Sequence, residues 1–249
     1  MLGDLFRTLL YQPLFNLLVF FYNIIPGHDL GIAIIVLTIV LRFILYPLSA
    51  KSVKSQKALQ DLQPELEKIK KQYQNDKEGM SRATMEFYRK NKINPLSSCL
   101  PILIQFPFLI AIYQVLRDGL NNPEVLKLLY SFVHNPGKLD PYFLNFLDLG
   151  ARNVYLAILA GVTQFWQSRM LMKKKKPAAR ASGNDFSAIA ANMTSQMVYI
   201  MPVLTIFIAL SFPAGLSLYW VATTLFSIVQ QWLVMRKDPD KDKESSPIS

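Results

Sequence analysis

The sequence predicts an all-α membrane protein with five transmembrane helices, an N-terminal interfacial helix and a cytoplasmic helical hairpin. Of its 249 residues 51% are hydrophobic and only 18% are charged, and the mean hydropathy is +0.23. These values are typical of polytopic membrane proteins rather than of soluble domains. We therefore interpret residues 1–249 as a single domain built from membrane helices.

Five apolar runs are near the ~20 residues that a helix needs to cross the hydrocarbon core of a bilayer. They are Gly31–Leu48, Leu96–Leu116, Asn153–Met172, Gln196–Phe212 and Pro213–Met235. An FPAG turn separates the last two. A further run, Leu14–Ile25, has only 12 residues between two prolines. This length favours a helix within residues 1–29 that lies in the membrane interface.

The distribution of Lys and Arg predicts the orientation of these helices. Residues 51–92 carry 11 basic residues, residues 173–180 carry five and the residues after Met235 carry four, whereas residues 118–150 carry two. Because basic loops stay in the cytoplasm, we expect the first three segments and the C-terminus inside and the N-terminus outside. These loops account for the net charge of +10, so it does not indicate DNA binding.

The cytoplasmic segment 51–92 has the pattern of a helical hairpin. Apolar residues recur at steps of three and four from Leu59 to Tyr73, and again from Met80 to Phe87 after an NDKEG break. A solvated spacer is the alternative interpretation.

Two other segments, the second cytoplasmic loop (173–190) and the tail (236–249), have no such periodicity, and we expect them to be flexible. The single cysteine, the two separated histidines and the lack of a phosphate-binding glycine loop give no support for a disulfide, a metal, a cofactor or catalysis.

Arg42 lies inside the first predicted span, in LTIVLRFILYPL. A cation at the centre of a membrane helix costs about 2.5–3.5 kcal/mol on insertion scales. Thr38 and Tyr46, four residues to either side, would share one helical stripe with Arg42. None of the five spans contains Asp or Glu, so they offer Arg42 no counter-ion. Snorkelling to the interface, or hydrogen bonding to nearby carbonyls, is the alternative.

Several polar, uncharged side chains in the other spans are candidates to surround Arg42. They are Gln105, Thr163, Gln164, Gln167, Ser217, Thr223, Thr224, Ser227 and Gln230. Each alone is explained by hydrogen bonding between membrane helices. Together with Arg42 they predict a hydrated cavity.

Three motifs, in this order, resemble the YidC-type membrane protein insertases of bacteria, which are related to the mitochondrial Oxa and chloroplast Alb proteins. They are LTIVLRFILYPLS, KINPLSSCLPILIQFPFLIAIY and FPAGLSLYWVATTLFSIVQQ. The resemblance covers nearly the whole chain. It implies an insertase and chaperone of the bacterial cytoplasmic (inner) membrane, with a hydrophilic groove open to the cytoplasm and to lipid. The large external domain of many relatives is expected to be absent.

The resemblance also implies which residues bind and release clients. The client-binding groove is expected at Arg42, Thr38, Tyr46 and Gln105, joined by the polar candidates Gln164, Ser217 and Thr224. The exit path along the second and fifth spans is expected at Ile102, Phe106, Leu109, Leu218, Trp220 and Leu225. An acidic client segment would supply the anion that Arg42 lacks.

Nascent membrane proteins are thus the expected partners, together with the Sec translocon, membrane lipids and, through the basic cytoplasmic loops, the ribosome. A competing interpretation is an anion channel or uniporter in which Arg42 is the selectivity element. A membrane enzyme has no support, because the spans contain neither a carboxylate nor a Ser, His and Asp arrangement.

Overall fold

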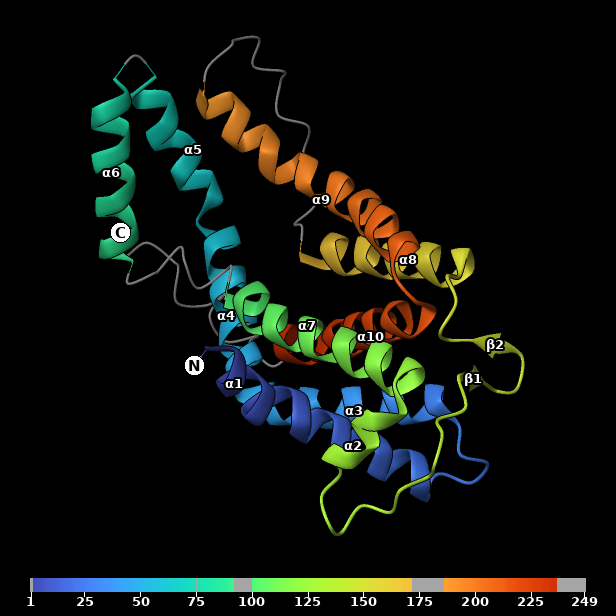
Figure 1. Ribbon diagram of the computed structural model, residues 1–249. Helices are drawn as coiled ribbons and strands as arrows, with labels where there is room; N and C mark the ends of the chain where they lie inside the picture. Colours follow the sequence, from blue (N-terminus) through green and yellow to red (C-terminus); the bar gives the residue numbers. More distant parts are fainter. Residues whose placement is uncertain (1, 75, 92–99, 172–185, 237–249) are drawn as a thin grey trace.

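The chain folds into a bundle of α-helices with a short β-hairpin at one end (Figure 1). The computed structural model describes residues 2–74, 76–91, 100–171 and 186–236. The predicted tail (236–249) lies outside these residues except for Arg236, and the predicted second cytoplasmic loop (173–190) does so up to residue 185. Its last five residues are helical rather than loop, because a helix begins at Phe186. The mainly helical character predicted from the sequence is confirmed for the described part.

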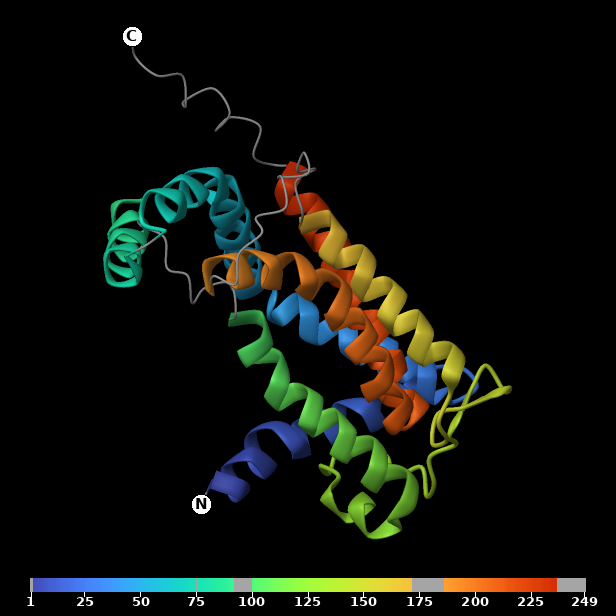
Figure 2. The ribbon, with the colours of Figure 1, turned by 90° about the horizontal axis from the view of Figure 1, so that it is seen from above.

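The N-terminal helix is longer than the sequence predicts. It runs without a break through α1 (Leu2–Phe6), the π-helical η1 (Arg7–Tyr11) and α2 (Gln12–Ile24). The prediction of a 12-residue helix is therefore wrong, because the wider π-helical turn accommodates the ring of Pro13. By length and composition Gly3–Ile24 is able to cross a membrane. Figure 2, however, shows α1 and α2 running across α7, so an interfacial position stays a prediction.

The first predicted span is broken before its end. The first helix, α3 (Leu30–Ile44), stops one residue before α4 (Tyr46–Asp61), and the two are bent by 69°. Pro47 explains the break, because it lacks an N–H and its ring clashes with the carbonyl one turn earlier. The residue before a proline is also driven away from the α-helical region.

Two charged helices, α5 (Gln63–Gln72) and α6 (Lys77–Lys90), extend from α4 and lie side by side (Figure 1). Asp76 caps α6, since its Oδ1 accepts a hydrogen bond of 2.9 Å from the N–H of Gly79. Their location in the cytoplasm stays a prediction.

The chain then crosses the bundle in α7 (Leu100–Asn121) and forms what we call the end cap, residues 122–153. The end cap contains η3 (Pro123–Leu128), β1 (Tyr142–Phe143) and β2 (Leu147–Asp148). The two strands are antiparallel, with Tyr142 opposite Asp148. The end cap lies away from α4, α5 and α6 (Figure 1).

Three further helices complete the described bundle, namely α8 (Val154–Leu171), α9 (Phe186–Ser211) and α10 (Ala214–Arg236). The predicted FPAG turn joins the last two. Close packing of α8 on α9 requires Gly161, because a Cβ there would clash with the side chain of Ile206 and lie 3.0 Å from the carbonyl of Pro202.

The buried core lies at the end-cap side of the bundle, where α2, α3, α7 and the start of α10 meet. Its deeply buried side chains include Phe15, Leu18, Leu30, Ile34, Ile112 and Leu149. Along α3 the core reaches as far as Leu41. The next residue is Arg42, so the candidate site begins where the apolar core ends.

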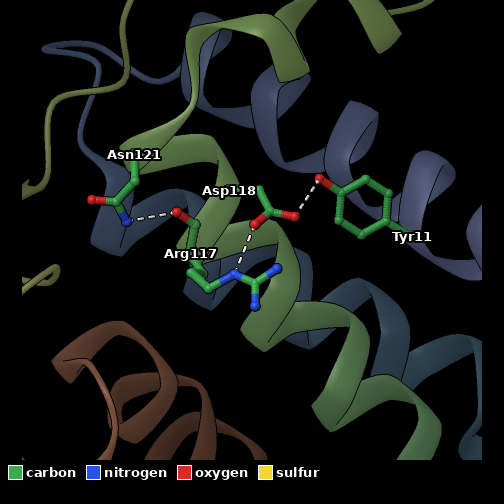
Figure 3. Close-up of polar contacts among 4 residues, drawn as sticks. All are labelled: Tyr11, Arg117, Asp118 and Asn121. Atoms are coloured by element: carbon green, nitrogen blue, oxygen red, sulfur yellow. Dashed lines mark hydrogen bonds and ion pairs between the residues drawn. The ribbon is translucent and has the colours of Figure 1, made fainter.

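The N-terminal helix is fastened to the end of α7 by a polar cluster (Figure 3). The hydroxyl of Tyr11 donates to Asp118 Oδ2 over 3.2 Å, and Nε of Arg117 donates to Asp118 Oδ1 over 2.8 Å. Nδ2 of Asn121 donates to the carbonyl of Arg117 over 2.6 Å. Asp118 is helical because α7 extends beyond Leu116, where the predicted span ends.

Large apolar side chains are exposed along the outward faces of the helices, as lipid contact requires. On α8 they are Tyr155, Ile158, Leu159, Val162 and Trp166. Among the described residues, two helices are long and apolar enough to cross a membrane, or three if the bent α3–α4 pair counts as one. The number of five spans therefore stays a prediction.

Asn16 provides a test of how the end cap is held. This buried side chain donates from Nδ2 to the carbonyl of Leu128 over 3.1 Å, and its Oδ1 accepts from the N–H of Tyr130 over 2.6 Å. Asn16→Ala leaves both groups without this partner, so we expect a loss of about 1–3 kcal/mol in unfolding free energy. Thermal unfolding in detergent measures the loss.

Asn23→Ala is the matched control, because this side chain is less buried than Asn16 and makes one described bond, of 2.6 Å, to the carbonyl of His134. We expect less than half the effect of Asn16→Ala. Equal effects would contradict the role given to Asn16.

Candidate functional site

Arg42 lies in the last turn of α3 and is joined to two other helices by hydrogen bonds. Its Nη2 donates to Gln105 Oε1 of α7 over 2.8 Å. Nε2 of Gln105 donates in turn to the hydroxyl of Tyr219 of α10. Arg42 and Gln105 are half-buried and Tyr219 is buried. One chain of hydrogen bonds thus holds α3, α7 and α10 together.

A small pocket lies beside this chain of bonds, and its volume of about 10 Å³ is room for about one water molecule. It is lined by Thr38, Leu41, Arg42, Leu45, Gln105, Phe108, Tyr219 and Thr223. Apolar side chains form its walls, and the polar groups come from α3, α7 and α10. A ligand in this pocket would meet one cation and several neutral hydrogen-bonding groups.

Within the described residues no carboxylate pairs with Arg42. Ion pairs of the described residues include those on α6, at the end of α7 and in η3. A guanidinium carries five N–H donors, and the described side chains give a partner to one of them, the Nη2 bonded to Gln105. The remaining donors are available to an anionic group, which is favoured over a neutral one by charge.

Thr38 and Gln105 line the pocket together with Arg42, and their role in client binding stays a prediction. The Thr38 hydroxyl donates to the carbonyl of Ile34 over 2.6 Å. Its oxygen therefore faces the pocket as an acceptor, since its one proton is used within α3.

Tyr46 is placed differently from the prediction. It follows the α3–α4 break and is not among the residues that line the pocket. Its carbonyl accepts a hydrogen bond of 3.2 Å from Nε2 of Gln230. The expected helical stripe through Thr38, Arg42 and Tyr46 is therefore interrupted, because Pro47 changes the direction of the helix.

Three more predicted groove residues are not brought to the pocket. Gln164 Oε1 accepts from the hydroxyl of Thr205 over 2.6 Å and so joins α8 to α9. The hydroxyls of Ser217 and Thr224 donate to backbone carbonyls of α9 and α10 over 3.5 and 2.9 Å. Hydrogen bonding within and between helices accounts for all three.

The predicted exit path is only partly on the surface. Phe106 of α7 and Leu225 of α10 are 60% and 43% exposed. Leu109 and Trp220 are half-buried, whereas Leu218 is 6% exposed and belongs to the core. The side chain of Ile102 lies outside the described residues.

Tyr219, which closes the chain of hydrogen bonds, is not among the site residues predicted from the sequence. Its spacing could have indicated it, because Tyr219 precedes Thr223 by four residues and both therefore lie on one face of α10. An aromatic residue in an apolar run is more often a packing or lipid-facing residue, so periodicity alone does not distinguish it.

Comparison with known proteins gives consistent matches. The family model described as the 60Kd inner membrane protein matches residues 20–242. The membrane protein insertase YidC of Fusobacterium nucleatum is 36% identical over 230 residues, covering 92% of this chain and 98% of that protein. The membrane protein insertase YidC 2 of Bacillus anthracis is 35% identical over 226 residues, covering 89% of this chain and 78% of that protein.

Other relatives are longer. The membrane protein insertase YidC of Geobacter sulfurreducens is 34% identical over 92% of this chain, but the match covers 38% of that protein. A crystal structure of an active YidC insertase, with its first transmembrane domain resolved, superposes with a TM-score of 0.60 at 26% identity. That match covers 88% of this chain and 45% of the other.

The bond between Gln105 and Tyr219 is tested by a double-mutant cycle. Because both side chains belong to one network, Gln105→Ala and Tyr219→Phe should be non-additive by about 0.5–3 kcal/mol in unfolding free energy. Thermal unfolding of the single and double variants in detergent measures this coupling. The control cycle replaces Tyr219→Phe by Tyr155→Phe, a side chain that is 84% exposed on α8. Equal coupling in both cycles would contradict the network.

Proposed function

The chain belongs to the YidC family of membrane protein insertases, and on this premise we propose that it receives nascent membrane proteins at Arg42 and releases their transmembrane segments into lipid. The observation that carries the proposal is the Arg42 guanidinium beside a small pocket, with a neutral amide as its partner among the described side chains. A cation in this setting favours an anion from outside the fold.

The acidic segment of a client that is about to become external supplies this anion. Its carboxylate meets Arg42 in a low-dielectric setting, where the attraction is much stronger than in water. No described ion pair of Arg42 has to break first, so the gain is not offset by the loss of an internal partner. Gln105 and Tyr219 hold the guanidinium in place while the carboxylate arrives.

The apolar segment of the client leaves sideways. Gln105 lines the pocket while its neighbour Phe106 is 60% exposed, so the polar site and the apolar surface of α7 adjoin. Burial of apolar area contributes roughly 25 cal/mol per Å². This gain drives release into lipid, and the scheme requires no nucleotide.

The chain is a multi-pass protein of the inner membrane. From the distribution of Lys and Arg we place its N-terminus outside and the basic helices α4 to α6 in the cytoplasm. Exposed lysines such as Lys51 and Lys54 on α4 are suited to the phosphates of ribosomal RNA. We include the ribosome, the Sec translocon and membrane lipids among the proposed partners.

Replacement of Arg42 tests the attraction. In vesicles that contain the purified protein, Arg42→Ala should reduce insertion of clients with acidic translocated segments about tenfold more than that of clients with neutral ones, which corresponds to ~1.4 kcal/mol. Arg42→Lys should retain most activity if charge matters more than guanidinium geometry. Arg169→Ala, which removes a cation stacked on Phe165 of α8, is the control and should affect both clients equally. Equal loss for both clients in Arg42→Ala would contradict the mechanism.

Photocrosslinking distinguishes the insertase from an anion channel. A photoreactive residue at Gln105 should crosslink to nascent chains during translation, whereas one at the exposed Phe132 of the end cap should not. Vesicles with the protein alone should show no steady anion flux. Flux without crosslinks would favour a channel with Arg42 as selectivity element.

A further inference from the structure

The β1–β2 hairpin of the end cap presents an uncharged, apolar tip. Residues 141–147 read PYFLNFL, and Tyr142, Leu144 and Phe146 are 45%, 53% and 72% exposed. In Figure 1 the hairpin projects from the end of the bundle where α3 and α8 begin. None of these three side chains is needed to fill the core.

The tip holds a leucine where the backbone disfavours one. The N–H of Phe146 donates to the carbonyl of Phe143 over 3.3 Å, and the two residues between them, Leu144 and Asn145, have φ of 51° and 63°. Such a turn is normally made by Asn, Asp or Gly, and a bulky residue with positive φ is uncommon. Asparagine would form the same turn with less strain, so the leucine side chain has a role other than turn formation.

The polar groups of the hairpin are arranged so that its tip can lie in the membrane interface. The N–H of Leu144 donates to Asp29 Oδ2 over 2.5 Å, so this amide does not need water. The two carboxylates of the hairpin region, Asp140 and Asp148, lie at the base of the hairpin, away from its tip. Asp148 Oδ1 accepts from the N–H groups of Gly150 and Ala151, and Asp140 precedes β1. Aromatic residues beside apolar ones, with charges set back, are typical of membrane–water interfaces.

The hairpin also lies close along the chain to the exposed apolar side chains of α8. From Asp148 the chain needs six residues to reach Val154, where α8 begins, and Val154 and Tyr155 are 55% and 84% exposed. An extended chain covers at most about 3.3–3.6 Å per residue. The hairpin is therefore within a short reach of the first exposed apolar residues of a membrane helix.

The hairpin is fixed rigidly to the start of α3. A Cβ on Gly31 would clash with the ring of Phe143, so strand and helix are in close contact. Asp29 caps α3 through a bond of 2.9 Å from the N–H of Ile32 and also holds the hairpin tip. From Leu30 to Arg42 is ~18 Å at 1.5 Å per residue. A hairpin held at the interface would thereby set the depth of Arg42 in the ~30 Å core.

We propose that Tyr142, Leu144 and Phe146 insert into the membrane interface at the end-cap face and anchor the bundle at a fixed depth. The occupant of this surface is lipid rather than a protein, because the tip is apolar and uncharged and lies a few residues along the chain from the exposed apolar side chains of α8. The proposal holds whether or not Arg42 binds clients.

Spin labels test the insertion. In a Cys99→Ser background, labels at Phe146→Cys and Lys138→Cys are compared in vesicles of phosphatidylethanolamine and phosphatidylglycerol. Lys138 lies in the same end cap and is exposed. We expect the ratio of oxygen to nickel-chelate accessibility to be at least about threefold higher at 146 than at 138. Equal ratios, or a label at 146 shielded from both reagents as in a protein contact, would overturn the proposal.

A second measurement tests the anchoring. The double variant Leu144→Asn, Phe146→Asn removes the apolar tip with residues that suit the turn, so its thermal unfolding temperature should not fall. A label at Tyr155→Cys then reports the depth of α8. Without the anchor the bundle should shift towards the membrane face nearer Arg42, because this shift brings the Arg42 cation closer to water. The label at 155, at the end-cap end of α8, then moves deeper into the bilayer, and its oxygen-to-nickel accessibility ratio should rise about twofold. An unchanged ratio would overturn the anchoring role.

Discussion

The whole arrangement depends on one constraint, a permanent cation at the edge of an apolar core. Arg42 follows directly after the last core residue of α3, and its described side-chain partner is the amide of Gln105. A neutral partner compensates the desolvation of a guanidinium only in part. An anion from outside the described fold would complete this compensation, and the proposed function assigns that anion to a client polypeptide.

The two ends of the bundle are held together by different forces. At the end-cap side, close apolar packing and the hydrogen bonds of the buried Asn16 and the half-buried Asp29 fix the helices. At the other side, polar contacts replace the core. Gln230 of α10 bonds both the Ser49 hydroxyl and the carbonyl of Tyr46, where the α3–α4 break frees backbone groups. The pocket lies between these regions, at the point where α3, α7 and α10 meet.

Much of the helical fold and part of the candidate site could be predicted from the amino-acid sequence alone. Apolar run length located the helices, and the cost of a charge in lipid pointed to Arg42, with Thr38 and Gln105 beside it. The break before Tyr46 was readable in principle from Pro47, but its angle depends on what α4 packs against. Gln164 and Thr224 face other helices because rotation about a helix axis is set by tertiary packing, which polarity does not encode. The length of the N-terminal helix depended on a π-helical turn that has no sequence signature here.

The most direct test of the central claim asks whether position 42 is reached from the cytoplasm. In a Cys99→Ser background, Arg42→Cys is exposed to a membrane-impermeant maleimide in vesicles of either orientation. The account predicts labelling from the face that carries α4 to α6 and none from the end-cap face. Absence of labelling from both faces would mean a sealed site and would contradict it.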